Sequence, residues 1–236
     1  MKSSGNRKFK AGPQKKWLID LHSAKRDVKS SKMTSRKLGR FDIGKEKVKH
    51  ALNFFAEAGL LKKIKRSGWW VAGIKDPESV ADHSFRCAVI AYYLAHLEKV
   101  DPMKAMAMAL FNDIHEARIN DLHKMGHHYI DFRQAERKVF QDQTERLDSH
   151  VRGALRPLRE EYDTQRTKVS IVARDADILE CLVQAKEYYD SGYLKARKFL
   201  QQAPLHLKTG SAKKIWQEIR KWDSSQWWES IVKFER

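Results

Sequence analysis

The sequence predicts an all-α protein in which a basic N-terminal extension precedes a helical bundle and short amphipathic helices follow it. Apolar residues recur at helical spacing from about residue 46 onward, and no segment shows convincing alternation of apolar and polar residues. Signals for helix starts precede several of these segments. Residues 1–40 have few periodic apolar residues and are rich in Lys, Ser and Gly. We expect them to be at best partly ordered.

Composition limits the classes of protein that the chain can represent. Its 236 residues, 42% of them hydrophobic, are enough for one folded domain with an appendage. No apolar run approaches twenty residues, and the N-terminus lacks a hydrophobic signal region, so we expect a cytoplasmic protein without a membrane partner. Cys87 and Cys181 lie in apolar helical patterns, and we interpret both as small buried hydrophobic residues rather than disulfide or metal-binding cysteines.

Charge and periodicity divide the chain into an extension over residues 1–45, a main domain over 46–200 and C-terminal helices over 201–236. Of the net charge of +17, most lies early: residues 1–50 hold sixteen Lys and Arg but four Asp and Glu. Such a segment attracts polyanions through counterion release, which makes a nucleic acid a candidate partner. A solvated tail that keeps the protein soluble is the alternative.

The first half of the main domain has three predicted helices. One begins near Gly44 and stops at Gly59. Residues 66–70 are expected to form a loop. A strongly apolar helix then starts at Ser79. Asp101-Pro102 starts the next, with Asp as the N-cap and Pro at the first helical position, and this helix is expected to continue through Ile114.

The second half continues the same pattern. Helices are expected over about 131–147, over a segment that ends near Tyr162, and over about 168–189, where Ser191-Gly192 stops the last of them. Two or three short amphipathic helices carry the C-terminal tryptophans, which we expect to pack on the domain or on a dimer partner. His123, His127 and His128 lie in a loop-like stretch, where a surface position is the simplest interpretation.

Three of these apolar helices contain polar residues that require an explanation, because burying an unpaired charge is costly. His83 lies one turn into the first, Asn112, Asp113 and Glu116 interrupt the second, and Asp177 lies in the third. Polar groups that converge from several helices form metal sites in helical bundles. The alternative is that His83 is a core histidine whose hydrogen bonds are satisfied. Asp113 and Glu116 would then form an ordinary solvent-exposed acidic stripe.

Imidazole and carboxylate ligands suit a divalent metal, and we expect Mn, Co, Zn, Ni, Fe or Mg. Such a metal polarises a phosphoryl oxygen and lowers the pKa of a bound water, while a neighbouring carboxylate orients that water.

Four ordered blocks of this sequence resemble the HD-domain superfamily of metal-dependent phosphohydrolases, and most of all its branch of 5'-deoxynucleotidases and archaeal relatives. The resemblance covers roughly residues 54–191. Its blocks are Arg66-Ser-Gly-Trp69, Pro77-Glu-Ser-Val-Ala-Asp-His83-Ser-Phe-Arg86, Phe111-Asn-Asp-Ile-His-Glu-Ala-Arg-Ile-Asn-Asp121 and Ala173-Arg-Asp-Ala-Asp177-Ile-Leu-Glu180.

The resemblance implies a set of metal ligands. His83, Asp113 and Asp177 match the family's first His, the Asp of its His-Asp pair and its distant Asp, and Asn112 occupies the position of the paired His. Asp175 is the alternative to Asp177 as the distant Asp ligand.

It also implies roles for four further residues. Glu116 matches the carboxylate that positions or activates the attacking water, and Asp121 matches a further acidic residue of the pocket. Arg66 and Trp69 match the loop that approaches the nucleotide, with the Arg facing the phosphate.

Asn112 is the one departure from this pattern. An amide oxygen is a weaker ligand than an imidazole for late transition metals. Three outcomes are open: Asn112 ligates weakly, His115 substitutes for the missing imidazole, or the metal is lost. We expect retained hydrolysis with weaker metal binding than the family norm.

The implied function is release of phosphate from a small phosphorylated substrate such as a nucleoside 5'-monophosphate, by a protein that dimerises as its family commonly does. The alternative is a non-enzymatic protein that binds nucleic acid or an acidic partner on an HD scaffold with an impaired metal site. Asn112 and the basic extension motivate this alternative.

Overall fold

The computed structural model describes residues 43–229 and 231–232. Within these residues the structure is helical, and the only β-type pairing is one antiparallel bridge between Lys65 and Ser79, which confirms the predicted all-α fold. No helix of this described part is long and apolar enough to cross a bilayer. The α-helices are α2 (Lys45–Leu60), α3 (Gly68–Val71), α4 (Val80–Glu98), α5 (Pro102–Phe111), α6 (Glu116–Ile119), α7 (Lys124–His127), α8 (Phe132–Glu145), α9 (Ser149–Thr164), α10 (Lys168–Asp190), α11 (Arg197–Gln202), α12 (Gly210–Ile219) and α13 (Gln226–Glu229), with 3-10 turns at Leu194–Ala196 and Ala203–His206.

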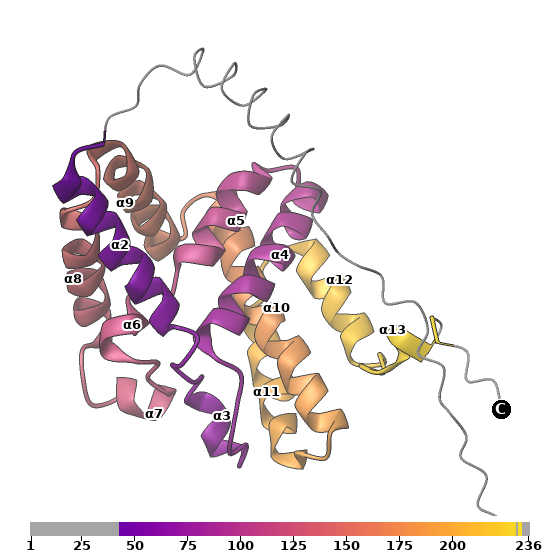
Figure 1. Ribbon diagram of the computed structural model, residues 1–236. Helices are drawn as coiled ribbons and strands as arrows, with labels where there is room; N and C mark the ends of the chain where they lie inside the picture. The colour runs from indigo at the N-terminus through magenta and orange to yellow at the C-terminus, as the bar shows by residue number, and fades with distance from the viewer. Residues whose placement is uncertain (1–42, 230, 233–236) are drawn as a thin grey trace, which may run out of the picture. The chain divides into compact units, whose positions relative to one another are not determined.

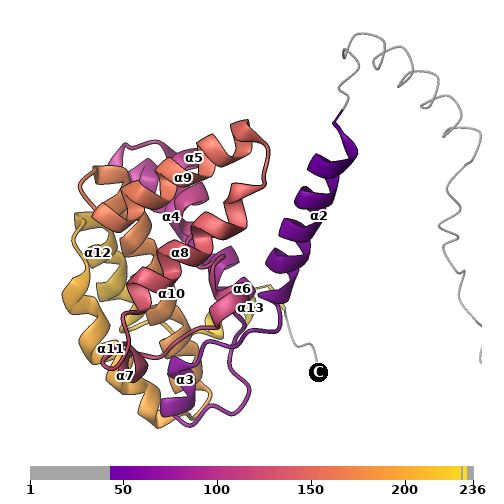
Figure 2. The same cartoon turned by 90° about the vertical axis from the view of Figure 1, so that its left-hand side faces the viewer.

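Helices α4, α5 and α10 form the centre of the bundle (Figures 1 and 2). α4 packs against α5 and α10, which also contact each other. Alanines line much of these contacts and allow the helix axes to approach closely. Leu94, Leu179 and Leu182 fill the remaining space as fully buried side chains. The buried alanines of α4, α5 and α10 are Ala88, Ala91, Ala95, Ala105, Ala109, Ala173, Ala176 and Ala185.

The structure confirms Ser79 and Asp101 as the predicted N-caps of α4 and α5. Ser79 and Asp82 form a capping box, in which the Ser79 hydroxyl accepts from the Asp82 amide at 3.1 Å and the Asp82 carboxylate accepts from the Ser79 amide at 2.9 Å. The Asp101 carboxylate accepts from the Lys104 amide at 3.0 Å, with Pro102 at the first helical position of α5. These caps fix where the two central helices begin.

One predicted helix end is wrong, and the difference shapes the candidate site. α5 ends at Phe111 instead of continuing through Ile114. The Asn112 carbonyl accepts from the Arg159 guanidinium at 2.8 Å and faces a ring nitrogen of His115 at 3.0 Å, while the Glu116 amide donates to the Asp113 carbonyl. The helical bond from Glu116 to Asn112 is therefore replaced, and residues 112–115 form a turn.

Two stretches expected to be loops contain single helical turns. α3 begins within the predicted 66–70 loop and ends one residue beyond it, at Val71, and α7 lies within the histidine-containing stretch that follows the candidate site. Four-residue turns bury too few periodic side chains to give a helical signal in the sequence.

The C-terminal helix α12 packs on α4 and α10, and Trp216 of α12 packs against the central core, as predicted for that residue. Asp175 of α10 fixes the start of α12, because its buried carboxylate accepts from the Lys208 amide at 3.0 Å and from the Thr209 amide and hydroxyl at 2.7 Å each. The domain boundaries at 45 and 200 stay predictions, and residues 1–42 of the expected extension lie outside the described residues.

We predict that Asp175→Ala lowers the free energy of unfolding by about 2–3 kcal/mol, because it leaves several buried donors without an acceptor. Urea denaturation measures this change. As a control, Asp142→Ala removes an exposed carboxylate of α8 that pairs with Lys138, and it should alter stability by less than about 0.5 kcal/mol. Equal effects of the two substitutions would contradict this account of Asp175.

Candidate metal centre

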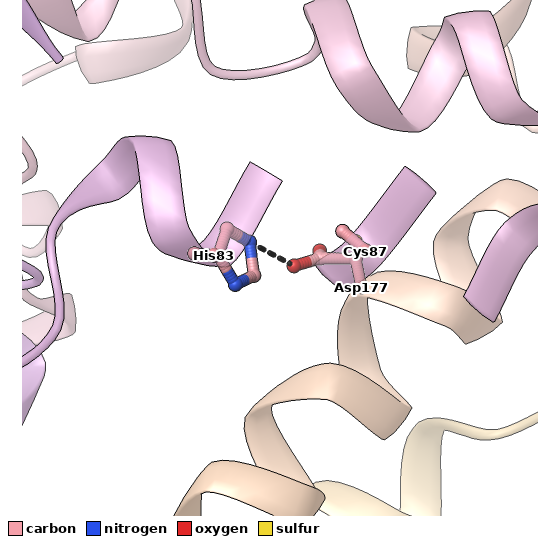
Figure 3. A group of neighbouring side chains, drawn as sticks. All are labelled: His83, Cys87 and Asp177. Atoms are coloured by element: carbon pink, nitrogen blue, oxygen red, sulfur yellow. Dashed lines mark ion pairs between the residues drawn. The ribbon is translucent and has the colours of Figure 1, made fainter. Parts of the chain in front are cut away.

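His83 lies one turn into α4 and is 1% exposed. Its Nδ1 contacts the carboxylate of Glu180. This contact directs Nε2 toward Asp177 Oδ1 at 3.2 Å and Asp113 Oδ2 at 3.4 Å. Figure 3 shows the His83–Asp177 ion pair. Side chains from α4, α10 and the turn after α5 thus meet at one buried point.

Glu180 is held in turn by Arg86 of α4. The Arg86 guanidinium donates to Glu180 Oε1 from Nε at 3.0 Å and from Nη2 at 2.8 Å, and it also binds Glu187 and Gln184. Burial opposes the charged form of Glu180, but the charges of His83 and Arg86 hold its pKa below the usual value. A carboxylate of this kind fixes the orientation of a metal-binding imidazole. Sequence motifs alone assigned no role to Arg86 or Glu180.

The two aspartates each use one oxygen for protein contacts and turn the other toward His83. Asp113 Oδ1 accepts from the Asn112 side-chain amide at 2.6 Å. Asp177 Oδ2 accepts from Arg174 at 2.6 Å and from the Tyr162 hydroxyl at 3.4 Å. Each aspartate is therefore oriented by its neighbours and keeps one oxygen for a cation.

The charges in this cluster stabilise one another. Burial opposes ionisation of Asp113 and Asp177, but His83, together with Arg174 beside Asp177 and Arg66 near both, keeps the pKa of each carboxyl below its usual value. Burial and the charge of Arg66 oppose protonation of His83. The surrounding carboxylates nevertheless raise the pKa of His83 well above its usual value.

Glu116 begins α6 and is 5% exposed, and its Oε2 is a buried oxygen for which the described structure provides no hydrogen-bond partner. Burial, together with the charges of Asp113 and Asp121, raises the pKa of Glu116 well above its usual value. A carboxyl group in this setting can hold a proton at neutral pH.

Arg66 extends toward the cluster, with its Nη1 3.9 Å from Asp113 Oδ2. Burial alone would lower the pKa of Arg66, but the charges of Asp113, Asp121 and Glu116 raise it well above the usual value. Asp121 fixes the loop that carries Arg66, because its carboxylate accepts from the Ser67 amide at 2.5 Å. The structure thus brings Arg66, Glu116 and Asp121 to the same region as the aspartates.

Trp69 is 2% exposed and lies under this loop. Its ring packs against Tyr188 and Phe199, with centroids 5.1 and 4.5 Å away, and its Nε1 donates to Glu78 at 3.0 Å. This geometry supports a role in positioning the Arg66 loop. Direct contact of Trp69 with a substrate stays a prediction.

The structure distinguishes between the alternative metal ligands that the sequence left open. Asp175 lies at the start of α12, whereas Asp177 lies at His83. His115 is buried, with Nδ1 at the Asn112 carbonyl and Nε2 3.5 Å from Glu136, so its ring nitrogens face the turn and α8. That orientation does not support His115 as a substitute for the missing imidazole.

Cys87 also lies at the centre, and the sequence analysis assigned it to the core alone. It follows His83 by four residues, a spacing that places both side chains on one face of α4. One donor atom each from His83, Cys87 and Asp177 lies within 4.8 Å of the other two. Cys181, by contrast, packs near Trp69 and Ala185 and is not a member of this group.

The donor set fits a divalent cation. His83 Nε2 lies 3.4 Å from an oxygen of Asp113 and 3.2 Å from an oxygen of Asp177, and the Glu180 carboxylate at Nδ1 fixes the orientation of the imidazole. The unpartnered Glu116 oxygen adds a polar atom without a protein partner close to the same charges.

The sequence is similar to curated proteins named 5'-deoxynucleotidase. The chain is 33% identical over 147 residues to a protein of Dictyostelium discoideum named 5'-deoxynucleotidase HDDC2, with 58% of this chain and 76% of that protein covered. It is 29% identical over 140 residues to the human protein of the same name, covering 59% and 68%.

Solved structures show the same fold. A conserved hypothetical protein from Pyrococcus furiosus matches 72% of this chain and 99% of its own, with 34% identity and a TM-score of 0.62. A predicted metal-dependent phosphohydrolase from Magnetospirillum magnetotacticum, 22% identical, matches the fold with a TM-score of 0.58 over 75% of this chain and 92% of its own. A family model described as HD domain matches residues 58–220. Because that model spans more than half of the sequence, the chain belongs to the HD domain family.

Proposed function

We propose that this protein is a metal-dependent phosphohydrolase that releases phosphate from nucleoside 5'-monophosphates. The observation that carries the proposal is the convergence of His83, Asp113 and Asp177 on one buried point, with Glu116 and Arg66 beside it. The relatives named 5'-deoxynucleotidase support the substrate class.

His83, Asp113 and Asp177 would hold the divalent cation. When bound, such an ion neutralises phosphate charge and makes a water molecule more acidic. The protein's own contribution is to fix the three donors before substrate arrives, through Glu180 behind His83 and Arg174 behind Asp177. The native metal stays a prediction.

Glu116 serves as the group that handles the proton of the reaction. As the water oxygen bonds to phosphorus and the bond from phosphorus to the ester oxygen breaks, a carboxylate at Glu116 Oε2 accepts the proton that the water loses, and the ester oxygen takes a proton from solvent and leaves as the nucleoside 5'-hydroxyl. Burial beside Asp113 and Asp121 raises the proton affinity of the Glu116 carboxylate, which makes its ionised form a stronger base than an exposed glutamate, and a cation bound nearby would favour that ionised form.

Arg66 serves to bind the phosphate. Its guanidinium stays charged at any physiological pH, and planar donors of this kind pair with phosphate oxygens. The bond from the Ser67 amide to Asp121 holds the backbone next to Arg66. Asp121 therefore acts on substrate binding through the loop.

A second candidate function is non-enzymatic binding of nucleic acid or an acidic partner. The excess of Lys and Arg in residues 1–50 and the amide at Asn112 favour it. Salt-sensitive binding to nucleic acid that disappears when residues 1–45 are deleted would support this function, and its absence at low salt would exclude it. Dimerisation stays a prediction.

Replacing Glu116 tests the proposed reaction. Glu116→Gln keeps the shape of the side chain but removes the base, so phosphate release should fall by about 10²–10⁴-fold while bound metal, measured by elemental analysis, is unchanged. Glu145→Gln, at an exposed position of α8, is the control and should retain full turnover. Undiminished turnover in Glu116→Gln would remove Glu116 from the mechanism.

Replacing Asn112 tests the cost of the missing imidazole. Asn112→His should bind Zn²⁺ or Co²⁺ at least about ten-fold more tightly than the natural protein, because an imidazole is a better donor to these ions than an amide. Titration against a chelator of known affinity measures the difference. Equally tight binding by both proteins would show that the amide at this position does not weaken the site.

A further inference from the structure

Cys87 places a sulfur atom at the candidate metal centre. The residue is 2% exposed and lies one helical turn after His83. Its Sγ, a ring nitrogen of His83 and a carboxylate oxygen of Asp177 all lie within 4.8 Å of one another (Figure 3). Thiolate, imidazole and carboxylate are the three side-chain donors that zinc-type ions accept.

The separation of these atoms suits a shared ion. Bonds from zinc to nitrogen, oxygen or sulfur are about 2.0–2.3 Å long, so two donors of one ion lie no more than about 4.6 Å apart. Donor atoms within 4.8 Å of one another therefore need only a small rotation of their side chains to bind one ion.

The side-chain NH₂ of Asn112 donates to Asp113 Oδ1 at 2.6 Å, so the amide orients the aspartate. His115 is turned toward Glu136. His83, Asp113 and Asp177 then supply three protein donors, the number that catalytic zinc sites use, and a fourth donor from Cys87 would leave a position for water in a five-coordinate ion.

We propose that Cys87 is a further protein ligand of the metal centre, bound through its thiolate. The inference rests on the proposed metal-dependent function. Binding breaks the S–H bond, forms a bond from sulfur to the ion, and releases the proton to solvent. Thiolate is a softer donor than carboxylate, so the centre prefers Zn²⁺ and Co²⁺ over Mn²⁺ and Mg²⁺.

Packing is the competing explanation, because Cys87 also belongs to the core cluster with Ala91 and Leu94. A cysteine that only packs fills space and makes no bond to an ion. The two explanations differ in a spectroscopic signal that does not depend on turnover: a Co²⁺–thiolate bond absorbs in the near ultraviolet, and cobalt bound to nitrogen and oxygen alone lacks this charge-transfer band.

The test loads the metal-stripped, full-length protein with one equivalent of Co²⁺ and records its absorption. We expect the near-ultraviolet band in the natural protein and in Cys181→Ser, and its loss in Cys87→Ser. Because the chain has two cysteines, a band that persists in Cys181→Ser assigns the thiolate to Cys87 even where Cys87→Ser does not fold. In a folded Cys87→Ser protein, Zn²⁺ affinity should fall at least about ten-fold, and Mn²⁺ affinity should change less.

Stoichiometric Co²⁺ binding without the band, or loss of the band in Cys181→Ser, would overturn the inference. Phosphate release by the same cobalt-loaded protein separates this failure from failure of the proposed function. Release without the band leaves a phosphohydrolase whose metal has no sulfur ligand. Failure to bind Co²⁺ at all would overturn the inference about Cys87, and phosphate release with Mn²⁺ or Mg²⁺ would then test the proposed function separately.

Discussion

Burying the imidazole of His83 between α4 and α10 places an ionisable group in the interior of the bundle. Isolated charge is costly there, so each charged group requires an oriented partner. Glu180 contacts His83, Arg86 binds Glu180, and Arg174 binds Asp177. All of these side chains come from α4 and α10. The register of the two helices is therefore constrained by this chain of ion pairs as well as by the alanines between them, and the site and the core stabilise each other.

The early end of α5 supplies the residues of the site that do not come from α4 or α10. Arg159 takes the Asn112 carbonyl out of the helical pattern, and the resulting turn carries Asp113 to His83 and begins α6 with Glu116. A helix continued through Ile114 would hold these residues in a different arrangement. The same turn uses the Asn112 side chain to orient Asp113. The departure from the family pattern at Asn112 thus has a visible structural role, which is compatible with a retained centre.

Local signals explain what could be predicted from the sequence. Capping residues such as Ser79 and Asp101 act within a few positions of themselves, so the helix starts were predictable, and ordered motif blocks pointed to His83, Asp113 and Asp177. The misses depend on contacts distant in sequence. The α5 end requires Arg159, which is 47 residues from Asn112. Cys87 is buried in the core, as predicted, and its spacing of four from His83 was the local signal for its place beside the candidate metal centre.

Phosphate release tests the central claim most directly. The protein is stripped of metal, divided, and supplied with Mn²⁺, Co²⁺, Zn²⁺ or Mg²⁺ singly before addition of ribo- and deoxyribonucleoside 5'-monophosphates, with a His83→Ala protein treated in the same way. The account predicts release that requires added metal and is absent in the variant, because His83 Nε2 lies between the free oxygens of Asp113 and Asp177. Release that is equal without metal, or equal in His83→Ala, would contradict a metal centre at His83. Absence of phosphate release with every metal and every substrate, both in the natural protein and in Asn112→His, would also contradict it.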